Sequence, residues 1–159
     1  MQVLDQREQF HNDTTDRDIT ISNILPKIIK GFVQAFPVTA DDYYPIDIYA
    51  ITKATIQAIP VQVKSRPTYH VDSFPTTKID TTAYDDLKNW GLLVILYPDD
   101  CKVLIYNHKE LQEAFVGNIW TKNVKTWRES KKKWEYEDKY LTDLTISKGR
   151  IYDYEYFGI

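Results

Sequence analysis

Three polar side chains, Asp47, Gln62 and Lys64, lie in segments whose other residues are typical of β-strands. Gln62 and Lys64 are two residues apart, so both project from one face of a strand, while Val61 and Val63 take the other face. Asp47 belongs to the preceding strand. If the two strands pair as a hairpin, a carboxylate, an amide oxygen and an ammonium group converge on one spot.

Phosphodiester hydrolysis is the chemistry that uses a carboxylate, an amide oxygen and an ammonium group in one place. Mg²⁺ or Mn²⁺ takes oxygen ligands, and we predict these from the side chains of Asp47 and Gln62 and from the backbone carbonyl of Val63. Lys64 would orient or deprotonate the attacking water, or stabilise charge on the phosphoryl oxygens. The predicted catalytic residues are therefore Asp47, Gln62 and Lys64, and Ser65 and Arg66 could contact the phosphate nearby.

Two plainer interpretations use the same residues. Gln62 and Lys64 could form the solvated face of an edge strand, and Asp47 could be a surface residue or a hydrogen-bond acceptor that stabilises a loop. The chain could also be an α/β protein unrelated to nucleases, with Asp47 and Lys64 on separate surfaces.

The elements that must position these residues follow from hydrophobic periodicity. From Asp18 a helix is expected, capped by Asp18 or Ser22, with Pro26 in its first turn and its end near 31–35. Strands are expected at 44–51 and 55–64, an irregular segment at 65–81, and a helix at 82–90. A fully apolar strand at 92–97 is followed by a turn, a strand at 102–106 and a short helix at 108–115. This order predicts an α/β fold with a central mixed β-sheet flanked by helices.

The C-terminal region, 119–159, predicts a basic helix at 123–136 and strands at 143–146 and 151–157 joined at Lys148-Gly149. Three tryptophans recur every seven residues and would share one helix face, which packs on the core or on a second subunit. The predicted DNA contacts are the basic residues of this helix, Lys125, Arg128, Lys131, Lys132 and Lys133. A solvated helix face is the alternative.

Pro45-Ile46-Asp47 followed by Gln62-Val63-Lys64-Ser65 resembles the PD-(D/E)XK restriction-endonuclease-like superfamily, some branches of which write the second motif as Q-V-K. The resemblance covers about residues 18–115. It implies a restriction-endonuclease-like core and a metal-dependent DNA endonuclease of homing, restriction or junction-resolving type. It also implies a homo-oligomer, a dimer or tetramer. A catalytically degenerate member that binds DNA or protein is the alternative.

This chain departs from the pattern of that superfamily at two places. The usual Glu of the second motif is Gln62, and the first helix lacks the Glu that the family often adds. Glu8, Asp16 or Asp18 would substitute if the N-terminal segment folds over the site.

Composition limits the class of protein. A length of 159 residues suits a single nuclease-like domain, 1–159, whose core is elaborated by residues 119–159. The only cysteine, Cys101, excludes a disulfide scaffold and fits a cytoplasmic protein, and no apolar run is long enough for a membrane span. The net charge of −3 conceals an uneven distribution: residues 1–50 hold 4 Lys and Arg against 8 Asp and Glu, whereas residues 122–133 hold 6 against 1.

Overall fold

The computed structural model describes residues 6–38, 46–66, 76–128 and 130–153, with side chains from Arg17 onward. Its three α-helices are α1 (Gln6–Ile28), α2 (Thr81–Leu87) and α3 (His108–Ala114). Its nine strands are β1 (Phe32–Pro37), β2 (Ile48–Thr52), β3 (Ala58–Ser65), β4 (Thr76–Asp80), β5 (Leu92–Tyr97), β6 (Lys102–Tyr106), β7 (Phe115–Arg128), β8 (Lys133–Thr145) and β9 (Arg150–Asp153).

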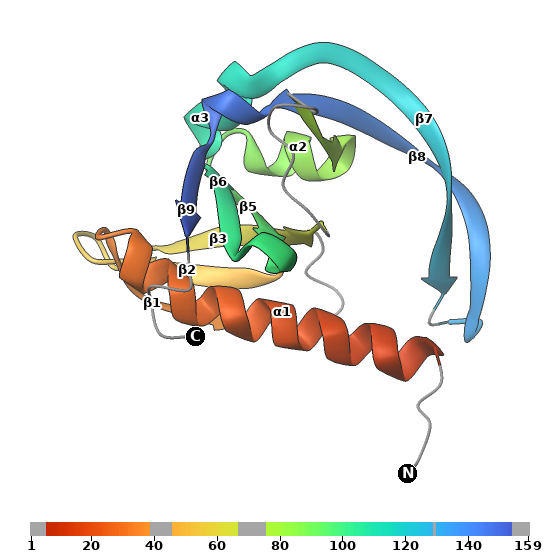
Figure 1. Cartoon of the computed structure of the whole chain (residues 1–159), viewed down its shortest axis with the longest axis horizontal. Helices are drawn as coiled ribbons and strands as arrows, with labels where there is room; N and C mark the ends of the chain where they lie inside the picture. The colour runs from red at the N-terminus through yellow and green to blue at the C-terminus, as the bar shows by residue number, and fades with distance from the viewer. Residues whose placement is uncertain (1–5, 39–45, 67–75, 129, 154–159) are drawn as a thin grey trace.

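The strands form two sheets. The larger sheet has the order β1-β2-β3-β5-β6-β9, in which β3 and β5 are parallel and all other neighbours are antiparallel. The smaller sheet has the order β4-β8-β7 and contains the long β7–β8 hairpin. Helix α1 crosses one face of the larger sheet, and α2 and α3 lie on the other side (Figure 1). The chain is thus a mixed α/β protein with a sheet flanked by helices, as predicted.

Two apolar clusters hold these layers together. The first joins the buried face of α1, with Ile21, Ile24 and Leu25, to Val61 and Val63 and to alternate residues of the central strands. The second lies on the opposite face, where alternate residues of β5 and β6 pack against α2, α3 and the end of β8. Strand β5 faces both clusters and is buried along its whole length, which confirms the expectation from its continuous apolar run.

The N-terminal third differs from the predicted pattern. Helix α1 begins at Gln6, so neither Asp18 nor Ser22 caps it, and Pro26 falls in its last turn rather than its first. Its end at Ile28 is followed directly by β1, which was not predicted. The residues expected to form an irregular segment at 65–81 include β4. Strand β2 begins at Ile48, and residues 44 and 45 of the predicted strand lie outside the described part of the chain.

The predicted basic helix at 123–136 is wrong, because these residues form the distal part of the β7–β8 hairpin. The seven-residue spacing of the tryptophans suggested one helix face. In the hairpin, Trp127 and Trp134 are directly opposed across the two strands, with ring centroids 5.5 Å apart. A spacing of seven residues also fits a hairpin, because Trp127 lies in β7 and Trp134 lies in β8, on either side of the turn.

The hairpin curves away from α2 and α3 toward the side on which the N-terminal end of α1 lies (Figure 1). Beyond it the chain returns to the core. The predicted strands at 143–146 and 151–157 do not pair with each other, since β8 pairs with β7 and β4, whereas β9 pairs with β6 at the edge of the larger sheet. Residues 154–157 lie outside the described part. None of the described helices is long and apolar enough to span a bilayer.

Candidate functional site

Asp47 lies directly before β2, against the middle of β3. Its backbone N–H donates to the carbonyl of Val61 at 2.9 Å, and its carboxylate Oδ2 accepts from the N–H of Val63 at 2.8 Å. These two hydrogen bonds bracket Gln62 and fix the carboxylate beside it. The hairpin predicted from the sequence is therefore present, and β2 and β3 bring Asp47 to the Gln62-Val63-Lys64 segment.

Gln62 is buried, with 2% of its surface exposed, and its Oε1 meets no hydrogen-bond donor among the described residues. A buried amide oxygen without a donor costs about 1–3 kcal/mol, so a protein that keeps one usually uses it. Alternation along β3 places Gln62 and Lys64 on the face opposite Val61 and Val63, which pack against α1. The edge-strand interpretation is excluded for these residues, since β3 lies inside the sheet between β2 and β5.

The Val63 carbonyl is the third predicted ligand. The N–H and C=O of a strand residue point to the same edge of the strand, and the N–H of Val63 is the one that donates to Asp47. The carbonyl therefore faces the side on which the Asp47 carboxylate lies, just before β2 begins at Ile48.

A second carboxylate comes from α1. Asp18 is 6% exposed, and Arg17 bridges it to Asp47, with Nη2 at 3.1 Å from Asp18 Oδ1 and at 3.7 Å from Asp47 Oδ2. Asp18 is thus the predicted substitute that the structure brings to the site. The side chains of Glu8 and Asp16, the other two, lie outside the described part of the chain. The signal for Asp18 was present in the sequence, because Asp18, Ile21 and Leu25 share one helix face.

Burial dominates the electrostatics of both carboxylates. It raises the pKa of Asp18 from 3.8 to about 6, against the opposing effect of Arg17, and the nearby charge of Asp47 raises it further. Burial likewise raises the pKa of Asp47, although the Val63 N–H, Arg17 and Lys64 oppose this. Two carboxylates held close together and poorly solvated are stabilised by a bound cation.

Lys64 and Arg66 supply positive charge next to the carboxylates. Burial lowers the pKa of Lys64, helped by the positive charge of Arg66 and opposed by Asp47. Burial also lowers the pKa of Arg66, whose guanidinium donates to the carbonyls of Ser65 at 2.9 Å and Lys78 at 3.1 Å. A lysine whose pKa is lowered in this way is in its neutral amine form to a larger extent than an exposed lysine at the same pH.

These residues fit a hard divalent cation. Two carboxylates, an amide oxygen without a donor and a backbone carbonyl are oxygen ligands of the kind that Mg²⁺ and Mn²⁺ prefer. Within the described ranges no group of three His, Cys, Asp or Glu side chains could hold a metal, so Gln62 would have to complete the set. The set lacks the soft ligands that favour Zn²⁺.

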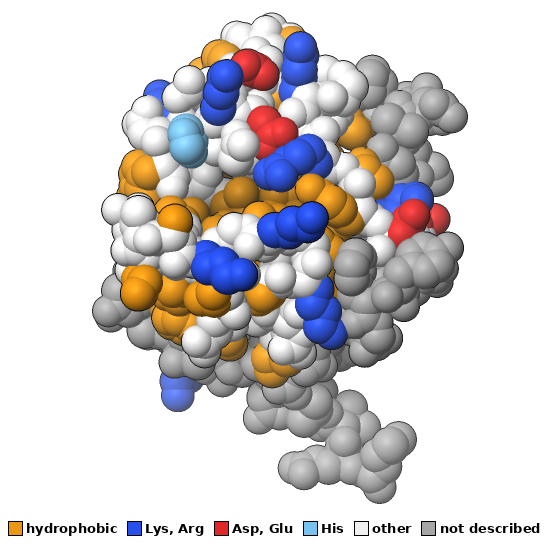
Figure 2. Space-filling model, turned by 90° about the vertical axis from the view of Figure 1, so that its left-hand side faces the viewer, with side chains coloured by type: hydrophobic (Ala, Val, Ile, Leu, Met, Phe, Trp, Pro, Cys, Tyr) orange, Lys and Arg blue, Asp and Glu red, His pale blue; other side chains and the backbone are white. Residues whose placement is uncertain are grey.

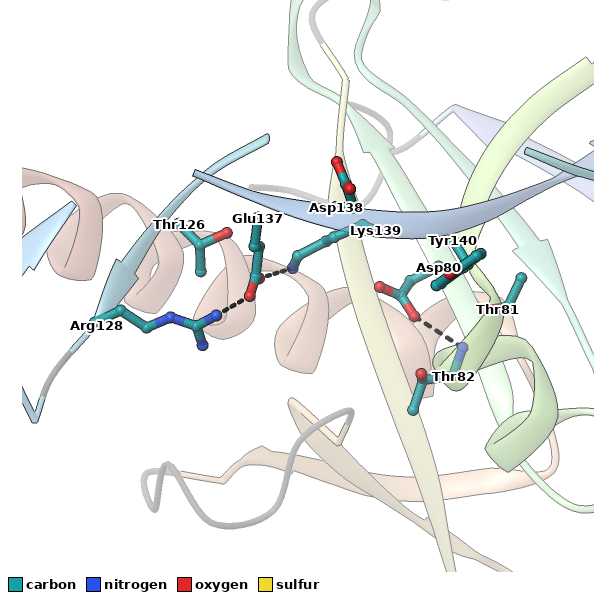
Figure 3. Close-up of a pocket in the computed structure, with 9 residues that line it drawn as sticks. All are labelled: Asp80, Thr81, Thr82, Thr126, Arg128, Glu137, Asp138, Lys139 and Tyr140. Carbon is teal, nitrogen blue, oxygen red and sulfur yellow. Dashed lines mark hydrogen bonds and ion pairs between the residues drawn. The ribbon is translucent and has the colours of Figure 1, made fainter. Parts of the chain in front are cut away.

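A cavity of about 370 Å³ lies next to this site, between β8 and the start of α2 (Figure 3). Arg128, Glu137 and Lys139 line it from the hairpin, Asp80 lines it from the end of β4, and Thr82 lines it from α2. Lys139 is near enough to Lys64 to lower the pKa of that lysine. The hairpin therefore places part of its inner surface beside Lys64, which the sequence did not predict.

The predicted DNA contacts all lie in the hairpin, but several are paired with acidic residues. Arg128 contacts Glu137, and Lys131 and Lys133 lie 3.0 Å and 3.4 Å from Glu135. Lys125 stands over the ring of Trp134 at 5.7 Å, and Lys132 occupies the turn with a φ of 50°. These side chains form a basic surface on the β-hairpin, in which several of the charges are paired with nearby acidic residues, and not the face of a helix.

The hairpin is not the only part of the molecule that carries basic residues. On the side where α3, β9 and the loop between β2 and β3 lie, Lys and Arg side chains are scattered among hydrophobic and uncharged ones (Figure 2). They are not gathered there into one patch, so that side offers no concentrated surface for a phosphate backbone.

No protein-family model, no curated protein and no solved structure matches this chain. Assignment to a family therefore depends on the residues and the topology of the chain alone.

Proposed function

We propose that the protein is a metal-dependent DNA endonuclease with a restriction-endonuclease-like core, and that its site comprises Asp18, Asp47, Gln62, Val63 and Lys64. The observation that carries the proposal is the Asp47 carboxylate bound to the N–H of Val63, next in the chain to Gln62, whose buried Oε1 meets no donor among the described residues. A cation, or a donor from a ligand, on the face of β3 that carries Gln62 would satisfy that oxygen.

The topology supports the same proposal. The order is a helix, a strand, a strand preceded by Asp47, a strand with Gln62-Val63-Lys64, the short strand β4, a helix and a strand parallel to β3. The PD-(D/E)XK resemblance implies the same order of helix, Asp strand, Q-x-K strand, second helix and last strand. Asp18 supplies the first-helix acid that the sequence lacked as Glu.

Each side chain has a role in this proposal. Asp18, Asp47, Gln62 and the Val63 carbonyl would hold Mg²⁺ or Mn²⁺, which would supply positive charge at the phosphate and increase the acidity of water. Lys64 Nζ, with its lowered pKa, takes the proton from the attacking water or donates a hydrogen bond to a phosphoryl oxygen. Arg66 and Lys139 add positive charge for the negatively charged backbone.

The hairpin is proposed to hold the DNA. Lys125, Lys131, Lys132 and Lys133 are exposed on it, and half-buried Arg128 and Lys139 line the cavity beside the site. Cleavage of both strands would require two sites, so a dimer or tetramer remains part of the proposal. Sedimentation velocity of the full chain, with and without duplex DNA, would measure the oligomeric state.

The decisive experiment is cleavage of DNA by the purified chain. Supercoiled plasmid, a pool of random-sequence duplexes and a four-way junction would be incubated with Mg²⁺, with Mn²⁺ or with EDTA. We expect metal-dependent cleavage of at least one substrate, lost in Lys64→Ala and Asp47→Asn. Lys53→Ala, which alters an exposed lysine in the loop between β2 and β3, is the matched control and should cleave normally.

The second candidate is a catalytically inactive protein of this fold that binds DNA. It is favoured by Arg17, which already provides a positive charge between the two carboxylates. Absence of cleavage by the wild type on all three substrates, with DNA binding unaffected by metal, would establish this candidate and refute the first.

A further inference from the structure

Arg17 lies between the two carboxylates of the proposed metal site, Asp18 and Asp47. Its Nε and Nη2 atoms are each 3.1 Å from Asp18 Oδ1, and Nη2 is 3.7 Å from Asp47 Oδ2. The guanidinium therefore joins two carboxylates that come from different elements, α1 and the segment before β2. The Arg17 side chain is only 19% exposed, so this is a largely enclosed contact.

The oxygens that Arg17 occupies are the ones a metal would use. Asp47 Oδ2 also accepts from the Val63 N–H, so one hydrogen-bond donor and the nearby Arg17 guanidinium already face this oxygen. Asp18 Oδ1 receives two donors from the same guanidinium. A cation and the Arg17 side chain therefore compete for the same two carboxylates.

We propose that Arg17 occupies the cation position in the metal-free protein and is displaced when a divalent cation binds between Asp18 and Asp47. This inference rests on the proposed metal-dependent function. Arg17 is then a positioning residue, because it holds two buried carboxylates together until the metal replaces it. Removal of its charge should strengthen metal binding and weaken the metal-free fold.

The first test measures Mn²⁺ binding to the full chain by isothermal titration calorimetry. Removal of the competing guanidinium should let Arg17→Gln bind Mn²⁺ roughly tenfold more tightly than the wild type, a difference of about 1.4 kcal/mol. Its melting temperature in EDTA should fall, and the increase produced by Mn²⁺ should be larger. Arg17→Lys, which keeps a single charge but not the forked geometry, should give an intermediate affinity.

The matched control is Arg150→Gln. Arg150 is also a half-buried arginine whose Nε donates to a carboxylate, Glu110 Oε1, at 3.2 Å, but it lies at the edge strand β9. Its substitution should leave the Mn²⁺ affinity unchanged. A purely structural role for Arg17 would lower the melting temperature without tightening metal binding.

The second test uses the wild type alone and needs no variant to fold. Mg²⁺ is titrated while the side-chain Nε–H signals of arginines are followed by ¹H–¹⁵N NMR. The Arg17 signal should shift, and its exchange with water should accelerate as the bond to Asp18 is lost. The Arg150 signal should stay unchanged as an internal reference.

The outcomes separate this inference from the proposed function. If the wild type binds Mn²⁺ but Arg17→Gln binds it equally or less tightly, and the Arg17 Nε–H signal is unaffected by Mg²⁺, displacement is refuted and the metal site stands. If the wild type binds no divalent cation by either method, the proposed metal-dependent function fails, and the inference fails with it.

Discussion

The raised pKa of Asp18 makes the stability of the metal-free protein dependent on pH. The folded protein binds a proton at Asp18 with a pKa of about 6, against 3.8 for the ordinary carboxyl group. Between these values the native state holds more protons than the unfolded state, so stability falls as pH rises through this range. Because one pKa unit corresponds to about 1.36 kcal/mol, Asp18 should remove about 2.4 kcal/mol between pH 4 and pH 7.5.

Asp18→Asn tests this magnitude, because asparagine resembles the protonated carboxyl group and does not titrate. The free energy of unfolding would be measured by urea denaturation in EDTA at several pH values between 4 and 7.5, followed by tryptophan fluorescence. The difference between Asp18→Asn and wild type should move in favour of the variant by about 2–3 kcal/mol over this range. Effects of the substitution that do not depend on pH cancel in this comparison.

Asp86→Asn is the matched control, since it removes an exposed carboxylate of α2 away from the buried cluster. Saturating Mn²⁺ should abolish most of the pH-dependent difference, because the wild-type carboxylates then carry a bound cation. A difference between Asp18→Asn and wild type that stays constant from pH 4 to pH 7.5 would refute the assignment of Asp18 as a buried, destabilised carboxylate.

Three further predictions concern other parts of the molecule. Gln62→Leu should raise the free energy of unfolding in EDTA by about 1 kcal/mol, because it removes a buried oxygen without a donor, and it should abolish stabilisation by Mn²⁺. Gln62→Glu should lower the metal-free stability and tighten Mn²⁺ binding. Urea denaturation with and without metal measures both effects, and equal Mn²⁺ affinity in the wild type and the two variants would contradict the site. Leu104→Ala should cost about 2–5 kcal/mol by urea denaturation, because Leu104 is fully buried in the cluster beneath α2 and α3, and a loss below 1 kcal/mol would mean that this layer is misplaced. Replacement of Lys131, Lys132 and Lys133 by Gln should weaken DNA binding, as measured by fluorescence anisotropy. The slope of log K against log salt should become less steep by about 0.9 for each phosphate that the variant no longer neutralises. An unchanged slope would show that the hairpin turn does not contact DNA.

The central part of the fold was predictable because its signals are local. The apolar face of α1, the continuous run of β5 and the turn before β6 each specify one element within a few residues. The two-residue spacing of Gln62 and Lys64 likewise determined that they share a face. These inferences needed only the period of a strand or helix.

Elements that depend on distant partners were not predictable in this way. The β7–β8 hairpin forms because Trp127 and Trp134 oppose each other and because β4 adds a third strand to one side. A basic, tryptophan-containing stretch is compatible with a helix until its cross-strand partners are known. Strand β9 is a similar case, since its partner is β6 rather than its sequence neighbour β8.

For the site, the sequence by itself determined which residue types were available: Asp47, Gln62 and Lys64 on neighbouring strands, and Asp18 on a helix face shared with Ile21. Only the tertiary structure decided that Asp18 and Asp47 lie together, with Arg17 between them. The physical reason is that charge interactions and burial depend on distances between elements far apart in the chain. Local periodicity fixes the direction of a side chain relative to its own element, but not the neighbours that raise or lower its pKa.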